Sequence, residues 1–244
     1  PLRLVGSEMC IRDRTYLNRF GDFAPESYAG KNLWFGVREH AMGAFVNGMA
    51  LSGLRAFAST FLVFSDYLKP AIRMASLMNL PSVFVFTHDS VMVGQDGPTH
   101  QPVEELAMLR SIPNHYVYRP CDANEIIGSW QALLNNDKPS SVVLLRSKAR
   151  NLDETDPLSV KKGAYVIRKE KKRLNGIIIA TGSEVELAMD VAEKLSDKGL
   201  ELRVVSMPCT RLFEEQPASY REETLPIGYK TFVIERASKF GWNK

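Results

Sequence analysis

The 244-residue sequence contains few cysteines and no long apolar run. Its three cysteines, Cys10, Cys121 and Cys209, are far apart and form no C-x-x-C pair. This spacing excludes a disulfide framework and indicates free thiols in a reducing compartment. The longest apolar runs, such as residues 82–86, are much shorter than the ~20 residues that span a bilayer. We therefore expect no membrane partner and, because no signal-peptide pattern is visible, a cytoplasmic location.

The sequence also lacks a strong charge of one sign. Its 31 basic and 28 acidic residues give a net charge of +3, which is too small to indicate a polyanionic partner. The densest basic stretch, residues 168–173, has no interleaved aromatic residues and is typical of a solvated turn. We expect no nucleic-acid partner.

Strand-like and helix-like segments alternate along the chain and predict an α/β protein. Helices are expected over residues 38–51, 64–79, 102–111, 123–135 and 183–198, and strands over 54–59, 82–88, 115–119, 141–146, 163–168, 176–181, 201–206 and 230–235. We predict two domains, each a mostly parallel sheet flanked by helices. Ligands bind beyond the carboxyl ends of the strands in such sheets, which directs attention to the loops after residues 60, 88 and 146.

The loop over residues 88–102, H-D-S-V-M-V-G-Q-D-G-P-T-H-Q-P, is the most informative segment. It combines two histidines, two acids, two glycines and two prolines directly after a strand that looks buried. His88 and His100 can donate hydrogen bonds or act as acid and base near neutral pH, and Asp96 can orient a hydroxyl. The alternative is a structural loop whose histidines bond backbone groups. A metal site is not favoured, because the histidines lack helical or short hairpin spacing.

Two further segments carry candidate residues. Glu39 is in the first turn of a predicted helix, where an acid is also explained by the helix dipole. Phe61, Phe64 and Tyr67 follow at i, i+3 and i+6, a spacing that is also typical of core packing. Each feature taken alone therefore has an ordinary structural explanation.

Together, these segments resemble the transketolase family. The stretches V-R-E-H-A-M-G, T-F-x-x-F-x-x-Y, H-D-S-x-x-x-G-x-D-G-P-T-H-Q-P and A-T-G-S-E-V occur in family order, and the resemblance runs from about Thr15 to the last residue. It implies a pyrimidine-binding domain of the thiamine diphosphate-binding fold and a transketolase carboxy-terminal-like domain. The implied activity is reversible transfer of a two-carbon ketol unit from a ketose phosphate to an aldose phosphate, in the pentose phosphate pathway.

The resemblance also implies roles in binding the cofactor, thiamine diphosphate. Glu39 would bond the pyrimidine ring nitrogen and act in catalysis by promoting formation of the ylid on the thiazolium ring. Phe61, Phe64 and Tyr67 would form the aromatic pocket around the pyrimidine, with Phe64 as the direct stack.

Four residues match substrate-contacting positions of the family. Asp96 would bond the hydroxyl next to the carbonyl, and His100 the carbonyl-derived oxygen, so that His100 is also a candidate catalytic residue. His88 would contact the phosphate end of the sugar, and Arg146 would bind the phosphate. The flanks of Arg146 depart from the family pattern, so an ion pair unrelated to substrate is the alternative for this arginine.

A turn in the second half, Gly182-Ser183-Glu184-Val185-Glu186, resembles an anion cradle because it follows a strand and opens a helix. Ser183 and Glu186 also fit a capping box, and we favour that structural interpretation.

The family's diphosphate-binding domain carries a Gly-Asp-Gly motif, which this sequence lacks. The resemblance thus implies that Mg²⁺ or Ca²⁺ binds to that missing domain, and we expect no metal ligand here. It also implies a homodimer for the full-length protein and inactivity of the isolated chain. The alternative is a non-catalytic or split subunit that needs a separate diphosphate-binding partner.

The expected domains are residues 15–150 for the pyrimidine-binding domain, 151–162 for a linker and 163–244 for a truncated carboxy-terminal domain. The last sheet is expected to be incomplete. Residues 1–14 fit neither domain, and Val5–Arg14 resembles translated sequencing-adapter sequence. We expect residues 1–14 to be an artefact and disordered.

Overall fold

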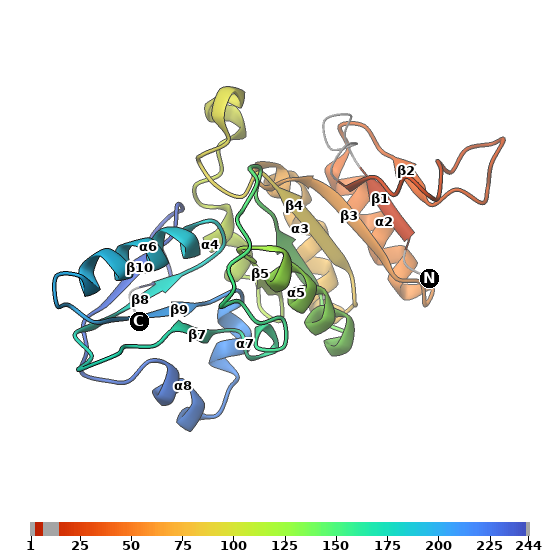
Figure 1. Ribbon diagram of the computed structural model, residues 1–244. Coiled ribbons are helices and arrows are strands. Elements are labelled where there is room, and N and C mark those ends of the chain that lie inside the picture. The colour runs from red at the N-terminus through yellow and green to blue at the C-terminus, as the bar shows by residue number, and fades with distance from the viewer. Residues whose placement is uncertain (1–2, 7–14, 243–244) are drawn as a thin grey trace. The chain divides into compact units, whose positions relative to one another are not determined.

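The computed structural model describes residues 3–6 and 15–242 (Figure 1). The chain divides into two compact units. One holds the residues up to His115 together with Asp137–Arg146, and the other holds Tyr116–Asn136 and the residues from Ser147 onward. Within the described residues, no helix is both long and apolar enough to cross a membrane.

A six-stranded sheet, in the order β2-β1-β3-β4-β6-β5, carries the candidate site. Its strands are β1 (Arg3–Gly6), β2 (Asn32–Trp34), β3 (Ala56–Phe61), β4 (Val83–Thr87), β5 (Tyr116–Tyr118) and β6 (Ser140–Val143). Every residue of β4 is buried, as the apolar run over 82–88 predicts, and every residue of β3 is buried as well. The two strands are parallel, with Phe61 opposite Thr87, and β6 continues the parallel order with Val143 opposite Phe86. The carboxyl ends of β3, β4 and β6 therefore lie at the same edge of the sheet.

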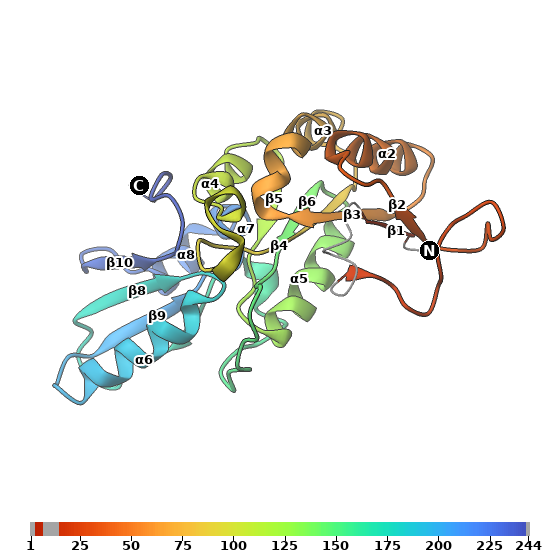
Figure 2. The same cartoon turned by 90° about the horizontal axis from the view of Figure 1, so that it is seen from above.

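Helices α2 (Glu39–Leu51) and α3 (Ser65–Leu77) lie side by side beside this sheet (Figure 2). Gly43 allows the close approach, because a Cβ at this position would lie 2.8 Å from the Cβ of Ala71. Asn47 links the helices, since its Nδ2 donates to the carbonyl oxygen of Ala71 at 2.8 Å. Helix α3 includes Pro70 and begins after a short 3₁₀ turn, η2 (Leu62–Phe64).

The expected disorder of residues 1–14 is wrong for Arg3–Gly6. These residues form β1, which pairs in parallel with both β2 and β3. The apolar and β-branched residues in the stretch R-L-V-G favour a strand, and two neighbouring strands supply backbone hydrogen bonds on both sides. Residues 1–2 and 7–14 lie outside the described residues.

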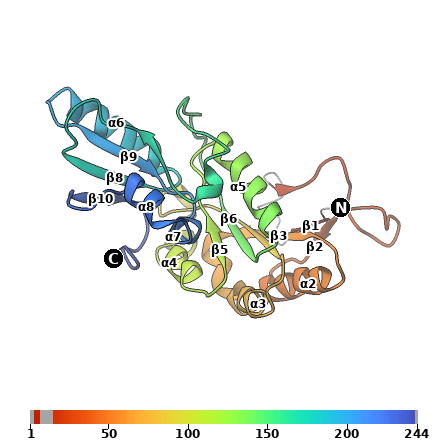
Figure 3. The same cartoon turned by 90° about the horizontal axis from the view of Figure 1, so that it is seen from below.

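The second unit contains a four-stranded sheet in the order β10-β8-β9-β7. Its strands are β7 (Tyr165–Arg168), β8 (Gly176–Ala180), β9 (Leu202–Ser206) and β10 (Thr231–Ile234). Strand β8 is parallel to β9 and β10, whereas β7 is antiparallel to β9, so this sheet is mostly parallel as predicted. Helix α6 (Glu184–Ser196) and helix α8 (Ala218–Thr224) lie on opposite sides of it (Figure 3).

The segment after β9, for which the sequence predicts no helix or strand, is helical. It contains α7 (Thr210–Glu214) and α8, which are anchored by tertiary contacts. The rings of Phe213 and Tyr220 meet edge to face at 6.3 Å, and the Tyr220 hydroxyl donates to the carbonyl oxygen of Ala164 at 2.8 Å.

The predicted capping box at the start of α6 is wrong. Ser183 has helical backbone angles, and its side chain caps no backbone N–H. Its hydroxyl instead donates to the neighbouring carboxylate of Glu184, and Glu186 faces Arg150 at 3.2 Å. The start of α6 is therefore held by side-chain contacts rather than by reciprocal capping.

The segment expected to be a linker is held against helix α5 (Ala123–Asn136) of the same unit. Asp122, just before α5, accepts the Thr155 hydroxyl at 2.6 Å and the Leu152 backbone N–H at 3.1 Å. A Cβ at Gly128 would lie 2.3 Å from the carbonyl oxygen of Pro157, so only glycine permits this approach.

Helix α4 (Glu105–Arg110) and the 3₁₀ turns η3 (Gly94–Asp96), η4 (Pro98–His100) and η5 (Val160–Lys162) complete the described elements. Cys121 and Cys209 are buried free thiols, as predicted for them, and Cys10 lies outside the described residues.

Candidate active site

The candidate site lies at the carboxyl edge of the six-stranded sheet. Phe61 is the last residue of β3, His88 directly follows β4, and Arg146 follows β6. Because these three strands are parallel neighbours, their ends converge, and the loops after residues 60, 88 and 146 meet as the fold class predicts.

An aromatic pair lines this edge. The rings of Phe61 and Phe64 stack with centroids 5.9 Å apart and planes inclined by 11°. The η2 turn between β3 and α3 brings the two rings together. Tyr67 continues the row, 6.3 Å from Phe64, but its side chain is 64% exposed. Core packing alone does not explain this row, because it runs from a buried ring to an exposed one.

Both histidines of the loop contact the aromatic pair. The ring of His88 lies 3.8 Å from that of Phe61, and His88 is buried. The ring of His100 meets Phe64 edge-on at 5.3 Å and Phe61 at 5.9 Å. Two imidazoles and two phenyl rings therefore form one cluster that can stack on a flat ring and exchange protons.

The backbone at His88 is strained. Its φ of 61° lies in the left-handed region, which costs a residue other than glycine about 1–2 kcal/mol. A hydrogen bond of 3.0 Å joins its Nδ1 to the Thr87 hydroxyl and fixes the ring. Such strain at a strand end is typical of residues that a site requires in one position.

Asp96 connects the histidine with the arginine. Its Oδ2 lies 3.8 Å from Nε2 of His88 and 3.4 Å from Nε of Arg146. The Asp96 side chain is 32% exposed, so the carboxylate faces solvent as well as both partners. Arg146 thus forms an ion pair, as the alternative interpretation expects, but its partner Asp96 is itself a candidate site residue. Together the carboxylate and the guanidinium can bind a hydroxyl and an anionic group side by side.

The loop itself is held by its own polar groups. Gln101 Nε2 donates to the carbonyl oxygen of Val91 at 2.9 Å, and the His100 N–H donates to that of Gly97 at 3.0 Å. Gly97 has φ 77° and ψ −176°, a conformation open essentially to glycine only. Among the described residues, the only hydrogen bond of the His100 ring is the one between Nδ1 and the Thr99 hydroxyl, at 2.9 Å.

Glu39 is positioned separately. It is the first residue of α2 and is only 5% exposed. Within the described part of the chain, its carboxylate forms no hydrogen bond or ion pair. The Arg38 guanidinium just before it donates to the carbonyl oxygen of Phe35 at 2.8 Å, which holds the entry to the helix.

Two threonines that orient the histidines, Thr87 and Thr99, were not predicted from the sequence. Each directly precedes its histidine, which is a signal that the sequence does contain. An acidic group of Asp66, Glu104 and Glu105, whose carboxylate oxygens come within 4.8 Å of one another, was also not predicted. These acids lie at the starts of α3 and α4, where helix dipoles favour negative charge, and Glu105 accepts the Val103 N–H at 2.7 Å.

Fold and site define an α/β protein with a ring-lined polar site at the carboxyl edge of a parallel sheet. Residues 2–151 match the family described as transketolase, pyrimidine binding domain, and residues 163–244 match the transketolase-like TK C-terminal domain. The chain belongs to the transketolase family.

Known relatives agree with this assignment. The transketolase of Streptococcus pyogenes serotype M6 is 49% identical over 98% of this chain and 34% of its own length. That of Bacillus subtilis is 49% identical over 100% of this chain and 38% of its own. The solved transketolase of Pichia stipitis in complex with sedoheptulose-7-phosphate has a TM-score of 0.92 at 34% identity, covering 98% of this chain and 37% of that one. The chain thus spans little more than a third of these relatives.

Proposed function

We propose that this chain supplies the pyrimidine-binding half of a thiamine diphosphate-dependent transketolase. The whole enzyme would reversibly transfer a two-carbon ketol unit from a ketose phosphate to an aldose phosphate. The observation that carries the proposal is the cluster of stacked rings, imidazoles, carboxylate and guanidinium at the carboxyl edge, in a chain of this family.

The residues present fit the cofactor. The stacked pair of Phe61 and Phe64, extended by Tyr67, offers a flat apolar wall for a pyrimidine ring. Glu39, nearly buried and without a partner among the described residues, would share a proton with a ring nitrogen. Bound thiamine diphosphate supplies a carbon nucleophile and an electron sink. The chain's own part is to hold the ring and that proton.

Four side chains would bind the substrate. Arg146 would exchange part of its contact with Asp96 for the sugar phosphate, and the Asp96 carboxylate would accept a substrate hydroxyl. His88 would orient the phosphate end. His100, fixed through Nδ1, would donate to the carbonyl-derived oxygen and move a proton there. The Pichia stipitis complexes with xylulose-5-phosphate, fructose-6-phosphate and sedoheptulose-7-phosphate support sugar phosphates as the substrate class.

The remaining parts of the proposal concern assembly. The metal ion, Mg²⁺ or Ca²⁺, would bind the cofactor's diphosphate through a Gly-Asp-Gly domain, a motif absent from these 244 residues. That domain would belong to a homodimeric full-length protein in the cytoplasm. A split subunit that receives it from a separate chain is the alternative. The free thiols of Cys121 and Cys209 support a reducing compartment.

The test is complementation. The purified chain is mixed with a diphosphate-binding domain of a transketolase, thiamine diphosphate and Mg²⁺, and ketol transfer is measured. The chain alone should be inactive and the mixture active. In the mixture, Glu39→Gln should reduce kcat at least about 100-fold, since proton sharing is lost. Arg146→Ala should raise KM for a phosphorylated donor but not for an unphosphorylated ketose.

The matched control is Glu186→Gln, which removes an exposed acid of the second unit and should leave all constants unchanged. Turnover by the chain alone would contradict the proposal that a diphosphate-binding domain is needed for activity. Unchanged kinetics in both Glu39→Gln and Arg146→Ala would remove the site assignment.

A further inference from the structure

The second sheet has its own topological switch point. From β8 the chain passes through α6 to β9 on one side, and then through α7 and α8 to β10 on the other side of β8. In open α/β sheets, the crevice at the carboxyl ends of two such strands is where ligands bind. Here that crevice lies between Thr181, which follows β8, and Glu235, which follows β10.

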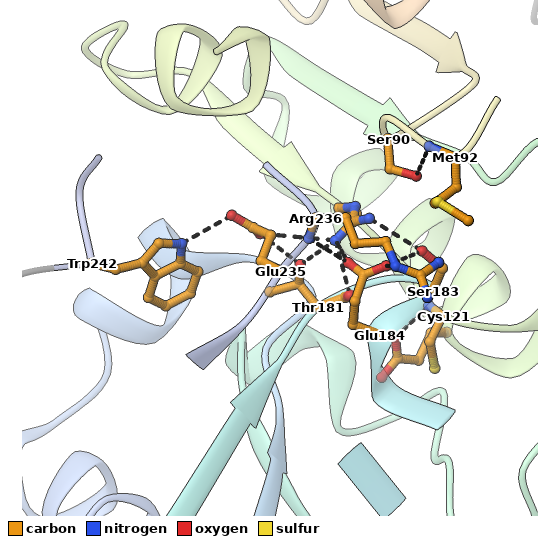
Figure 4. Close-up of polar contacts among 11 residues, drawn as sticks. Ser90, Met92, Cys121, Thr181, Ser183, Glu184, Glu235, Arg236 and Trp242 are labelled. Carbon is orange, nitrogen blue, oxygen red and sulfur yellow. Dashed lines mark hydrogen bonds and ion pairs between the residues drawn. The ribbon is translucent and has the colours of Figure 1, made fainter. Parts of the chain in front are cut away.

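The guanidinium of Arg119, a residue of the same unit, fills this crevice and is fully buried. Its Nη1 donates to the carbonyl oxygen of Thr181 at 2.9 Å, to the Thr181 hydroxyl at 2.7 Å and to the Glu184 carboxylate at 2.5 Å. Its Nη2 donates to the Ser183 hydroxyl at 3.3 Å, and Oε2 of Glu235 lies 3.9 Å from Nη1. Figure 4 shows Thr181, Ser183, Glu184 and Glu235 gathered around one point.

The surroundings are shaped for a planar cation. Gly182 has a φ of +52°, and a Cβ there would lie 2.8 Å from both Cγ and Nε of Arg119. Any larger residue would therefore enter the space that the guanidinium occupies. The backbone of Arg119 is held independently, since its N–H donates to Pro208 and its carbonyl oxygen accepts the Gly182 N–H, at 2.8 and 3.0 Å. Removing the side chain should thus leave the crevice in place.

The charges of the crevice balance only when a cation is present. Glu184 and Glu235 contribute two negative charges, and Arg119 and Arg236 two positive ones. Glu235 is fixed by Thr181 at 2.6 Å and by the Trp242 indole N–H at 2.9 Å (Figure 4). Without Arg119, the crevice carries one uncompensated negative charge and several buried acceptors, which excludes phosphates and carboxylates as occupants.

We propose that the switch-point crevice of the second sheet is a guanidinium-binding site, occupied by the chain's own Arg119. The ligand position of this unit is thereby closed to anionic substrates. The site accepts a free guanidinium ion once the Arg119 side chain is removed, because the fork of N–H donors and the charge can then be restored from solution.

The experiment compares thermal unfolding of the 244-residue chain and of Arg119→Ala with about 20 mM guanidinium chloride, far below the molar concentrations that denature proteins. Guanidinium should raise the Tm of Arg119→Ala by roughly 3 °C and leave the unaltered chain unchanged. Ammonium chloride at equal ionic strength should have no such effect. The matched variant is Arg150→Ala, which removes an exposed arginine of the same unit and should show no rescue.

An Arg119→Ala variant as stable as the unaltered chain, or rescued equally by ammonium, would overturn the proposal. If Arg119→Ala fails to fold, Arg119→Lys decides, since it keeps the charge but lacks the fork. A clear loss of Tm in Arg119→Lys supports a guanidinium-specific site, and an unchanged Tm refutes it.

Discussion

Several single residues of this chain have a shifted pKa, and Glu105 is one of them. Burial raises the pKa of its carboxyl, as do the charges of Glu104 and Asp66 nearby, while the N–H of Val103 acts in the opposite direction. Because the pKa in the folded state is raised, the ionised form at neutral pH costs stability. That cost disappears as the pH falls through the folded-state pKa.

We therefore expect Glu105→Gln to raise the Tm at pH 7 by roughly 1–3 °C, since the amide oxygen can still accept the Val103 N–H. Thermal unfolding followed by circular dichroism between pH 7 and pH 4 measures the effect, which should shrink as the pH falls. Glu26→Gln, at an exposed position, is the control and should change nothing. A lower Tm for Glu105→Gln than for the unaltered chain at pH 7 would contradict this prediction.

The pKa of Glu170 is shifted in the opposite direction to that of Glu105. Arg203 donates to both of its carboxylate oxygens, at 3.0 and 2.7 Å, and these hydrogen bonds hold the pKa of Glu170 below its usual range. The pair therefore stabilises the fold above the unfolded pKa of about 4.3, and this stability is lost as the pH falls through the folded-state pKa.

We expect Glu170→Gln to have a lower Tm than the unaltered chain at pH 7. The Tm values of the two proteins should converge as the pH falls toward 3. Denaturation followed at both pH values checks it. Glu186→Gln serves as the comparison because its pair with Arg150 is exposed, and such pairs contribute little at any pH. A constant difference between the two proteins across this range would show that the Glu170 carboxylate is not the titrating group.

The site residues could be named from the sequence, but their geometry could not. The motif around His88, Asp96 and His100 is long and specific enough for the family to be identified. The left-handed φ of His88 and the position of Asp96 between two basic side chains depend on how separate loops meet. The roles assigned to these residues remain predictions.

At the scale of elements, replacing two helical glycines by alanine should change the stability in opposite directions. A Cβ added at Gly48 in α2 would meet no neighbour within 4 Å, so Gly48→Ala should gain stability by about 0.5–1 kcal/mol from helix propensity. Gly128 in α5 faces Pro157 and Val160, where a Cβ would lie at 2.3 and 2.7 Å. Gly128→Ala should therefore lose stability by about 1–3 kcal/mol despite the same propensity gain.

Chemical denaturation of the two variants and the unaltered chain provides the comparison, with each variant serving as the other's control. Equal changes of the same sign would show that propensity outweighs packing at Gly128, and the close approach of the 151–162 segment to α5 would then be wrong.

Elements with a strong apolar pattern could be predicted and weakly patterned ones could not. The run over 82–88 marks β4, because a strand buried on both faces needs apolar residues throughout. Helices α7 and α8 are short, are separated around Pro217 and carry several charges, so their sequence shows no helical period. They form because Phe213 and Tyr220 pack against each other and the sheet, a contact that no local pattern contains.

For the whole molecule, the alternation of elements was enough to predict two mostly parallel sheets. It could not reveal that Arg119, a charged residue at the end of a strand-like run, would fill the crevice of the second sheet. Nor could it place β1 inside the first sheet, because residues 1–14 were expected to lie outside both domains. Both outcomes depend on which segments become neighbours in space.

Because β3, β4 and β6 are parallel, the turns that precede them lie at the opposite ends of the strands from the ring cluster. The turns there, at Gly53, Asn79 and Asp137, are exposed and use left-handed backbone conformations without taking part in the ring cluster. A fluorophore, an affinity tag or a tether to a surface attached at these turns would report on the protein from the far end of the strands. The turns at which a label can be attached thus lie at the opposite ends of the strands from the candidate active site.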